Sequence, residues 1–350
     1  MVLEKVALEE AFVLPEDAGD FRSLDPAQLQ KFAYANGVDS NFLLRGGDRL
    51  AEFDEVRLRE MDTYGIDHVI LSLCGTHSIE QILDTKAAVA KARKVNDFLA
   101  TVVAAHPTRY SGFASVALQD PAAAVAELER SITQLGFKGV LINGYTNIGD
   151  AAHGRYLDDP ANDEFWAAAD ELDAPVYIHP RTNLFGGAGI YEGHSEMLGH
   201  VWGYAMETAT HVIRVVLAGV FDRHPGAKLI VGHLGEGIPA LLGRLQYTFG
   251  QTPQDKQLER RIVDYFADNI LFTTSGNFND QALVAAMLTV GEDNIMFSVD
   301  YPWARTEDAA PWIENAAISE STRRKIAAGN ARRIFDLPVS GPSRVRANPV

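Results

Sequence analysis

Eight short apolar runs, each followed by a stretch with helical periodicity, constrain the fold of this 350-residue chain more than any other feature. Most of the runs are apolar at nearly every position over four to six residues, as strands buried on both faces of a parallel sheet are. The runs are KVALEE, DHVILSLC, YSGFASVAL, FKGVLIN, PVYIHP, KLIVGHLG, NILFTTSG and NIMFSVDYP. Eight strand-then-helix units in series favour a (β/α)8 TIM barrel over an open doubly wound α/β sheet, although the count alone leaves both possible.

The stretches between these runs have the pattern of amphipathic helices, with Asp or Asn near the start and Gly or Pro near the end. Examples are FDEVRLREMDTYG, TKAAVAKARKVNDFLATVVAAHP, DPAAAVAELERSITQLG and DQALVAAMLTVG. Two connections are longer than a barrel needs, and long connections often form binding loops or lids. We therefore expect one barrel domain over residues 1–337 with insertions near 13–53 and 181–199, followed by a loosely held tail over 338–350.

Composition narrows the partners and the compartment. The formal net charge of −16 argues against nucleic acid or an anionic membrane surface as a partner. Cys74 is the only cysteine, so no disulfide forms within the chain, and no apolar run is long enough to cross a membrane. A soluble cytoplasmic protein is expected. Phosphate-binding loops and the GxSxG motif are absent, so nucleotide hydrolysis and serine-esterase chemistry are poorly supported.

Polar residues follow the predicted strands at the point where each strand ends, and in a barrel these ends share one face. Glu9, His179 and Asp300 follow the first, fifth and eighth runs. Two carboxylates and an imidazole are ligands for a divalent cation, whose charge would offset the cost of burying the carboxylates. This mostly oxygen set favours Mn²⁺ or Mg²⁺ and leaves Zn²⁺ possible.

The same carboxylates can also be explained without a metal. Glu9 or Glu10 could instead pair with a buried arginine, such as Arg244 or Arg181. Strand alternation places Glu9 and Ala11 on one side of the first strand and Glu10 on the other. If Glu9 binds a metal, Glu10 is then expected to be the structural partner of a basic side chain.

A second pair of residues suggests acid-base chemistry. His233 and Glu236 lie three residues apart at the end of the sixth run, where a helical turn would bring them together. A carboxylate on one ring nitrogen fixes the tautomer and leaves the other nitrogen free for proton transfer. Alternatively, Glu236 is only a first-turn helix residue. Phe12 and Trp202 lie near the same face and could wall a substrate pocket. His194 and His200 lie in the second long loop, where they could touch substrate, and their roles are not assigned.

Together the motifs resemble those of a known family. ALEEAF, YIHPR, GHLGEGIP, TTSGNF and SVDYPW, in this order and at these spacings, are similar to the amidohydrolase-related metal-dependent decarboxylases. The resemblance is strongest to the 2,6-dihydroxybenzoate (γ-resorcylate) and 2,3-dihydroxybenzoate decarboxylases, and it extends from about Val6 to Leu337. It implies a barrel that assembles as a homotetramer or homodimer, with one divalent metal and no organic cofactor.

The resemblance also implies roles for single residues. It makes Glu9, His179 and Asp300 the metal ligands, His233 with Glu236 the acid-base pair, and Arg244 and Asn143 substrate-orienting groups. One position departs from the γ-resorcylate pattern, because Ala11 stands where those enzymes carry a histidine.

The expected reaction is the non-oxidative decarboxylation of an ortho-hydroxybenzoate, a small aromatic acid. A protonated Asp300 would deliver its proton to the carboxyl-bearing carbon, after which the C–C bond breaks and its electrons return to the ring. Two alternatives stay open: a metal-dependent hydrolase of an ester, amide or lactone, and a barrel that only binds an aromatic acid. The sequence does not choose among the hydroxybenzoates.

Overall fold

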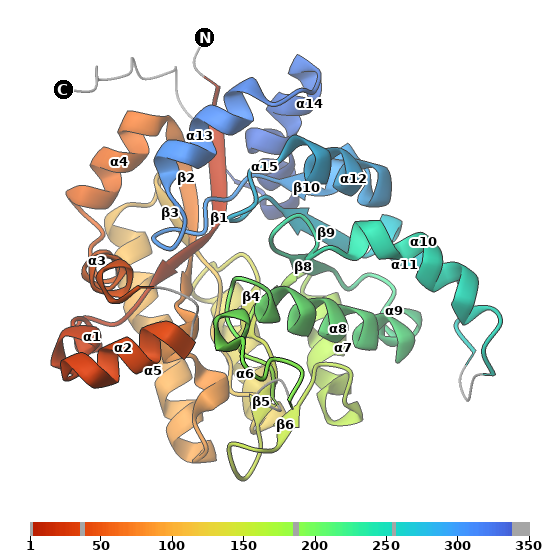
Figure 1. Cartoon of the computed structure of the whole chain (residues 1–350), viewed down its shortest axis with the longest axis horizontal. Helices are drawn as coiled ribbons and strands as arrows, with labels where there is room; N and C mark the ends of the chain where they lie inside the picture. The colour runs from red at the N-terminus through yellow and green to blue at the C-terminus, as the bar shows by residue number, and fades with distance from the viewer. Residues whose placement is uncertain (1–2, 36–38, 185–188, 254–256, 338–350) are drawn as a thin grey trace.

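Eight parallel strands ring the centre of the molecule in the computed structural model, which describes residues 3–35, 39–184, 189–253 and 257–337 (Figure 1). The strands are β1 (Lys5–Phe12), β2 (Ile66–Leu73), β3 (Tyr110–Gly112), β4 (Val140–Asn143), β7 (Val176–His179), β8 (Leu229–Val231), β9 (Ile270–Thr273) and β10 (Ile295–Met296). Each overlaps one of the eight apolar runs, so the predicted (β/α)8 architecture is confirmed.

The barrel closes through two seams. Parallel ladders join β1-β2-β3 in one arc and β10-β9-β8-β7-β4 in the other. Between β3 and β4, Ala114 bridges to Val140. Between β10 and β1, the hydroxyl of Ser298 accepts the Glu9 N–H at 2.7 Å, and the Ala11 N–H donates to the carbonyl of Tyr301 at 2.7 Å.

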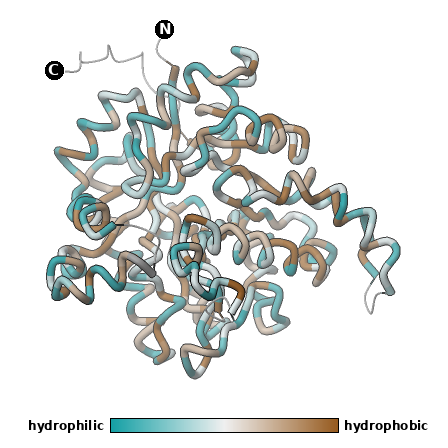
Figure 2. The backbone as a smooth tube through the Cα atoms, in the orientation of Figure 1, coloured by the Kyte–Doolittle hydropathy of each residue, from teal (hydrophilic) through white to brown (hydrophobic). Residues whose placement is uncertain are grey.

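Helices cover the outside of the strands. They are α4 (Val56–Tyr64), α5 (Thr85–Ala105), α6 (Pro121–Thr133), α7 (Asp163–Glu171), α8 (Gly203–Leu217), α9 (Val220–Arg223), α10 (Ile238–Phe249), α11 (Ile262–Asp268), α12 (Asp280–Val290), α13 (Thr306–Asn315), α14 (Glu320–Arg324) and α15 (Asn330–Phe335). The expected start signals are used: the side chains of Asp84, Asp120 and Asn279 accept backbone N–H groups at the starts of α5, α6 and α12. Figure 2 shows hydrophobic and hydrophilic residues alternating along these outer helices, as one buried face requires.

The long connections carry structure of their own. The first insertion contains α1 (Asp20–Ser23), α2 (Pro26–Ala35) and α3 (Ser40–Leu50), which lie at one side of the barrel in Figure 1. The second includes a 3₁₀ turn at Ser195–Met197, and a two-stranded ribbon of β5 (Thr146–Asn147) and β6 (Gly154–Arg155) follows β4. The tail predicted over 338–350 lies outside the described residues. None of the helices that the structure describes is long and apolar enough to cross a membrane.

The strand β1 has a β-bulge next to Glu9, one of the proposed metal ligands. Its pairing with β2 shifts register between Ala7 and Glu10, so a bulge lies at Leu8–Glu9. Val6 and Leu8 pack inside the barrel, whereas Ala7 between them packs against the helices. Without the bulge, strict alternation from Val6 would send Glu9 outward, so the bulge turns Glu9 toward the barrel interior.

Candidate metal centre and active site

The carboxyl ends of three strands bring Glu9, His179 and Asp300 together. One ligand atom of each residue lies within 4.8 Å of the other two. Glu9 Oε1 lies 3.5 Å from His179 Nε2. Within the described ranges, neither Glu9 Oε1 nor His179 Nδ1 has a hydrogen-bond partner. A buried carboxylate oxygen without a partner costs free energy, and a cation held by Glu9 Oε1 and the nearby His179 Nε2 would supply the missing interaction. The donor set therefore fits a divalent metal.

Interior side chains hold Glu9 in this position. The hydroxyl of Tyr177 donates to Glu9 Oε2 and also contacts the hydroxyl of Thr273 at 2.6 Å. Burial raises the pKa of Glu9, and the nearby charges of His233 and His179 oppose this rise. A bound cation would act in the same direction as these histidines and favour the carboxylate form.

The alternative in which a buried arginine pairs with Glu9 or Glu10 does not match the geometry. Arg181 donates to the carbonyl of Tyr145 at 2.6 Å and to Asn147 Oδ1 at 2.5 Å, and Arg244 is exposed on α10. Neither arginine forms an ion pair with Glu9 or Glu10 in the part of the chain that the structure describes.

Glu10 points to the other side of β1, as strand alternation predicts, but its partners differ from the expected basic side chain. Glu10 Oε1 accepts the N–H of Val299 at 2.9 Å and the hydroxyl of Ser298 at 3.3 Å. Burial raises the pKa of Glu10 to about 7, and the bond from Val299 and the charge of Arg57 work against this rise. Glu10 therefore ties β1 to the segment after β10.

The structure brings His233 and Glu236 together at the end of β8. His233 Nδ1 lies 2.7 Å from Glu236 Oε1, and its Nε2 lies 3.8 Å from Asp300 Oδ2. His233, Leu234, Glu236 and Asp300 all have positive φ, between 52° and 75°. Residues other than glycine rarely adopt this left-handed backbone conformation, and a cluster of such residues is typical of a functional site.

The charge state of this group favours proton transfer. Burial opposes a charged His233 ring, but the Glu236 carboxylate and the nearby Asp300 carboxylate outweigh it and raise the pKa of His233 well above the usual value. Burial also raises the pKa of Asp300, and His233 lowers it. The protonated form of the His233 ring is therefore favoured, beside the proposed metal ligands.

A cavity of about 650 Å³ opens onto these residues. His179, His233, Glu236 and Asp300 lie in its wall. Aromatic and apolar walls come from the first insertion and from the segment after Asp300: Phe32, Phe42, Leu43 and Trp303. Such a mixture of apolar walls and convergent polar groups is typical of a site for a small organic ligand.

Three predicted substrate contacts lie elsewhere in this chain. Phe12 is fully buried against Phe53 and Phe98, because the alternation that turns Glu9 and Ala11 inward turns Phe12 toward the helices. Trp202 is 47% exposed just before α8, and Arg244 is exposed on α10. None of the three lines the cavity within this chain, and their roles in binding substrate stay predictions.

Asn143, in contrast, lies close to the centre. It is buried at the end of β4, and a Cβ at Gly75 would lie 3.1 Å from its Oδ1 and 3.2 Å from His179 Cε1. Its Oδ1 has no hydrogen-bond partner among the described residues. Asn143 therefore lies beside a proposed metal ligand rather than at the cavity surface.

Sequence reasoning missed several cavity residues. Arg181, Tyr204 and Cys74 line the cavity. Of the two histidines that the sequence offered as possible contacts, His200 lines the cavity, whereas His194 is exposed and contacts Glu196 at 3.1 Å. For Tyr177, which holds Glu9, a signal was present, because it lies two residues before His179 and strand alternation puts both on one face. For the loop residues no periodicity marks which side chains turn inward.

Comparisons with known proteins agree with this geometry. The family model described as amidohydrolase matches residues 24–337. The gamma-resorcylate decarboxylase of Rhodococcus jostii (strain RHA1) is 40% identical over 338 residues, which cover 95% of this chain and 98% of the relative. The gamma-resorcylate decarboxylase of Rhizobium radiobacter is 40% identical over 335 residues, with coverage of 95% and 98%.

Solved structures give the same picture. A crystal structure of 2,6-dihydroxybenzoate decarboxylase complexed with 2,6-dihydroxybenzoate has a TM-score of 0.86 and 40% identity, covering 96% of this chain and 99% of the other. A dihydroxybenzoic acid decarboxylase from Polaromonas sp. JS666, with bound manganese and the inhibitor 2-nitroresorcinol, has a TM-score of 0.86 and 40% identity, with coverage of 96% and 98%.

Proposed function

The chain belongs to the amidohydrolase family, and on that premise we propose that it is a metal-dependent, non-oxidative decarboxylase of an ortho-hydroxybenzoic acid. The observation that carries this proposal is one cavity that joins the Glu9, His179 and Asp300 group to a proton-holding His233. The decarboxylase activity of relatives that match over nearly the whole chain supports it. The products are CO₂ and a phenol, and the enzyme is a carboxy-lyase.

One divalent metal ion is the cofactor, and Glu9, His179 and Asp300 are its proposed ligands. The manganese in the Polaromonas structure supports Mn²⁺. When bound, the ion supplies positive charge that holds the carboxylate and the ortho oxygen of the acid in one orientation. No organic cofactor is required, because the protonated ring itself accepts the electrons of the breaking C–C bond.

Asp300 is the proposed proton donor. Loss of CO₂ directly from the ring would leave a carbanion in the ring plane, where the π system does not stabilise it. Asp300 instead delivers a proton to the carboxyl-bearing carbon, and burial, which raises its pKa, favours the protonated form that this step needs. The C–C bond then breaks, its electrons return to the ring, and CO₂ leaves while the new C–H bond remains.

His233 and Glu236 support this step. The 2.7 Å contact with Glu236 holds the Nδ1 side of the ring, so Nε2 faces Asp300 at 3.8 Å. In this orientation the charged ring stabilises the Asp300 carboxylate that remains after proton delivery, and it can return a proton to that carboxylate for the next turnover.

Release of CO₂ from a panel of hydroxybenzoates tests the proposal. We expect manganese-loaded protein to decarboxylate at least one ortho-hydroxybenzoate, and we expect Asp300→Asn to lower the rate by about 10²-fold or more. Asp120→Asn is the matched control, because asparagine caps a helix as well as aspartate does. Turnover of an ester or lactone without CO₂ release from any acid in the panel would favour hydrolysis instead.

We also propose that the chain forms a homodimer or homotetramer through the groove between α8 and α10. This groove, of about 590 Å³, is lined mainly by aliphatic side chains: Met206, Ala209, Ile213, Leu217, Ile238, Leu241, Leu242 and Leu245. Leu241 is 60% exposed, and α10 projects from the barrel at the right of Figure 1. An exposed apolar surface of this kind is typical of an interface between copies of a chain. The cytoplasmic location stays a prediction.

A further inference from the structure

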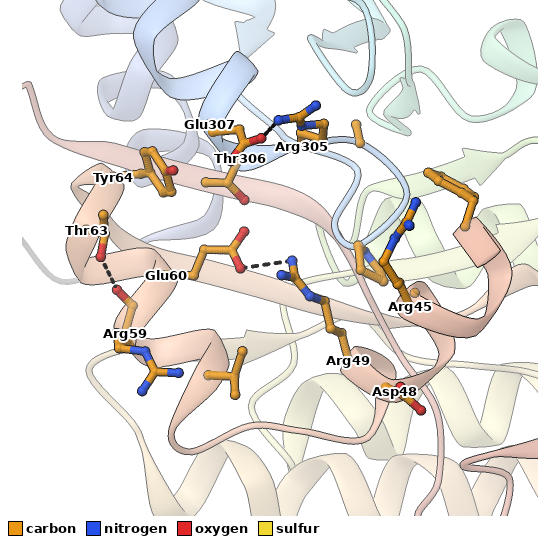
Figure 3. A pocket seen from close by; sticks show the side chains of 15 residues that line it. Arg45, Asp48, Arg49, Arg59, Glu60, Thr63, Tyr64, Arg305, Thr306 and Glu307 are labelled. Atoms are coloured by element: carbon orange, nitrogen blue, oxygen red, sulfur yellow. Dashed lines mark hydrogen bonds and ion pairs between the residues drawn. The ribbon is translucent and has the colours of Figure 1, made fainter. Parts of the chain in front are cut away.

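A second cavity, of about 770 Å³, lies outside the barrel between α3, α4 and the segment that leads into α13 (Figure 3). Four arginines line it: Arg45, Arg49, Arg59 and Arg305. Three carboxylates line it as well: Asp48, Glu60 and Glu307. In a chain with a formal net charge of −16, four guanidinium groups around one cavity are a local reversal of the overall charge.

The ion pairs leave this cavity with unneutralised positive charge. Arg49 pairs with Glu60 at 3.1 Å, and Arg305 pairs with Glu307. Asp48 is held by Arg22, which does not line the cavity. Arg45 and Arg59 have no carboxylate partner among the described residues. In Figure 3, Arg45 extends upward from α3 near the segment that carries Arg305, whereas Arg59 lies at the opposite end of the cavity.

Most of the remaining wall is apolar, and Thr63 and Thr306 are its uncharged polar residues. Phe42, Val56, Tyr64 and Pro302 line the space between the charged groups. An inorganic anion would leave these walls without contacts, whereas a planar ring would cover them. A guanidinium group binds a carboxylate through two parallel hydrogen bonds, so the combination suits an aromatic ring that carries a carboxylate. We propose that this cavity is a second binding site, separate from the metal centre, for an aromatic carboxylate.

The two cavities share a wall. Phe42 and Ala304 line both, and the rings of Phe42 and Trp303 lie 5.9 Å apart. A Cβ at Gly46 would lie 2.6 Å from Trp303 Cζ3, so α3 packs directly on the wall of the first cavity. The guanidinium of Arg49 lies 5.8 Å from the ring centre of Tyr301, the residue after Asp300. An occupant of the second cavity therefore contacts the segment that carries Asp300.

Because an occupant of the second cavity contacts the segment that carries Asp300, it is expected to change the rate of the reaction. This consequence rests on the proposed function. An aromatic acid in the second cavity changes the packing of Trp303 and with it the seating of the substrate. The enzyme then responds to the concentration of its own class of substrate. Benzoate, which lacks the ortho hydroxyl, is expected to act as a mixed inhibitor that lowers kcat as well as raising KM.

Calorimetric titration of manganese-loaded protein with benzoate tests the site, after the metal centre has been filled with 2-nitroresorcinol. We expect one benzoate to bind per chain. Arg45→Gln is expected to weaken binding about tenfold or more, because it removes a charge-assisted hydrogen bond. Arg93→Gln, which removes an exposed charge on α5, is the matched control. Neutral benzamide is expected to bind at least tenfold more weakly than benzoate to the unchanged protein.

Two results would overturn the proposal: no benzoate bound under these conditions, or binding that is equal for benzamide and unchanged in Arg45→Gln. The outcome is independent of the decarboxylase assay. If no hydroxybenzoate is decarboxylated but benzoate binding still depends on Arg45, the proposed reaction fails and the second site stands. If CO₂ is released but benzoate inhibits only by competition in both the unchanged protein and Arg45→Gln, the regulatory role fails.

Discussion

The adjacent carboxylates of Glu9 and Glu10 have different roles because the bulge in β1 and the strand alternation after it send them to opposite sides. Glu9 points into the barrel and reaches His179, whereas Glu10 is bonded to the segment after β10. Both are almost fully buried, so burial alone does not distinguish them. The orientation of each side chain decides which carboxylate is available to a metal.

This difference gives a matched test of the metal centre. Glu9→Gln is expected to lower the manganese content of purified protein from about one per chain to below a tenth, because an amide oxygen carries no charge for the cation. Glu10→Gln, one residue away, is expected to keep its metal. Elemental analysis of both variants after dialysis measures this. Equal metal content in the two would show that Glu9 is not a ligand.

A second residue-scale prediction concerns His68, which is buried between Thr108 and Ser111. Burial lowers its pKa to about 4, with the bond to Thr108 opposing the shift. Below the unfolded-state pKa of about 6.5, the unfolded chain takes up a proton that the folded chain excludes. The contribution of His68 to the free energy of unfolding is therefore fully present above pH 6.5. It declines as the pH falls toward 4 and is lower by about 2 kcal/mol at pH 5.

Urea denaturation at pH 7.5 and pH 5 measures this decline. In His68→Gln the loss between the two pH values is expected to be about 2 kcal/mol smaller than in the unchanged protein. His153→Gln, at an exposed histidine, serves as the control. An identical loss in all three proteins would contradict the prediction.

Single residues also show where sequence reasoning stops. Polar residues that end buried strands could be identified because their position in the strand pattern fixes which barrel end they occupy. Glu9, His179 and Asp300 are of this kind. Arg244 and Trp202 lie on a helix and in a loop, where no pattern in the sequence tells whether a side chain turns toward the barrel. The bulge at Leu8–Glu9 has no signature of its own, so the inward direction of Glu9 followed only from assuming a metal.

At the scale of elements, the sequence predicted the barrel helices better than the insertion. The helices α5, α6 and α12 have a capping Asp or Asn and a long apolar stripe, and all three form as expected. The first insertion was expected only as a long loop, yet it holds α1, α2 and α3. Asp39 caps α3 by accepting the N–H groups of Asn41 and Phe42 at 2.8 and 3.0 Å. Such short helices depend on tertiary packing, which periodicity does not reveal.

The packing of α3 on Trp303 gives an element-scale prediction. Gly46→Ala would place a methyl group 2.6 Å from the Trp303 ring. We therefore expect the free energy of unfolding to fall by about 1–3 kcal/mol and KM to rise. In Gly243→Ala, in α10, the added methyl group meets no atom within 4 Å. The free energy of unfolding of this variant is expected to rise by about 0.5–1 kcal/mol, because alanine has the higher helix propensity. Urea denaturation and steady-state kinetics of both variants measure these effects. A stabilised Gly46→Ala with unchanged KM would mean that α3 does not press on the cavity wall.

At the scale of the whole molecule, the barrel gathers residues far apart in the chain onto one face, and its outer surface leaves the α8–α10 groove uncovered. Leu241→Asp is expected to shift the protein to smaller species in light scattering, because a charge cannot be buried unpaired in an apolar interface. Leu83→Asp, at a leucine that is 46% exposed outside the groove, is the control and should leave the mass unchanged. Equal masses for both variants and the unchanged protein would contradict an interface at this groove.

The seam between β10 and β1 has a consequence for the order of events during synthesis. The ribosome makes Glu9 before β2 to β10 and makes Asp300 only after them, so seven of the eight barrel strands are synthesised between the two proposed ligands. The seam that joins them uses Ser298, Glu10 and Tyr301, and it cannot form until the last strand has emerged. A chain interrupted before residue 300 therefore has neither the closed seam nor the third proposed metal ligand, so manganese binding is expected only after the last strand has joined the barrel.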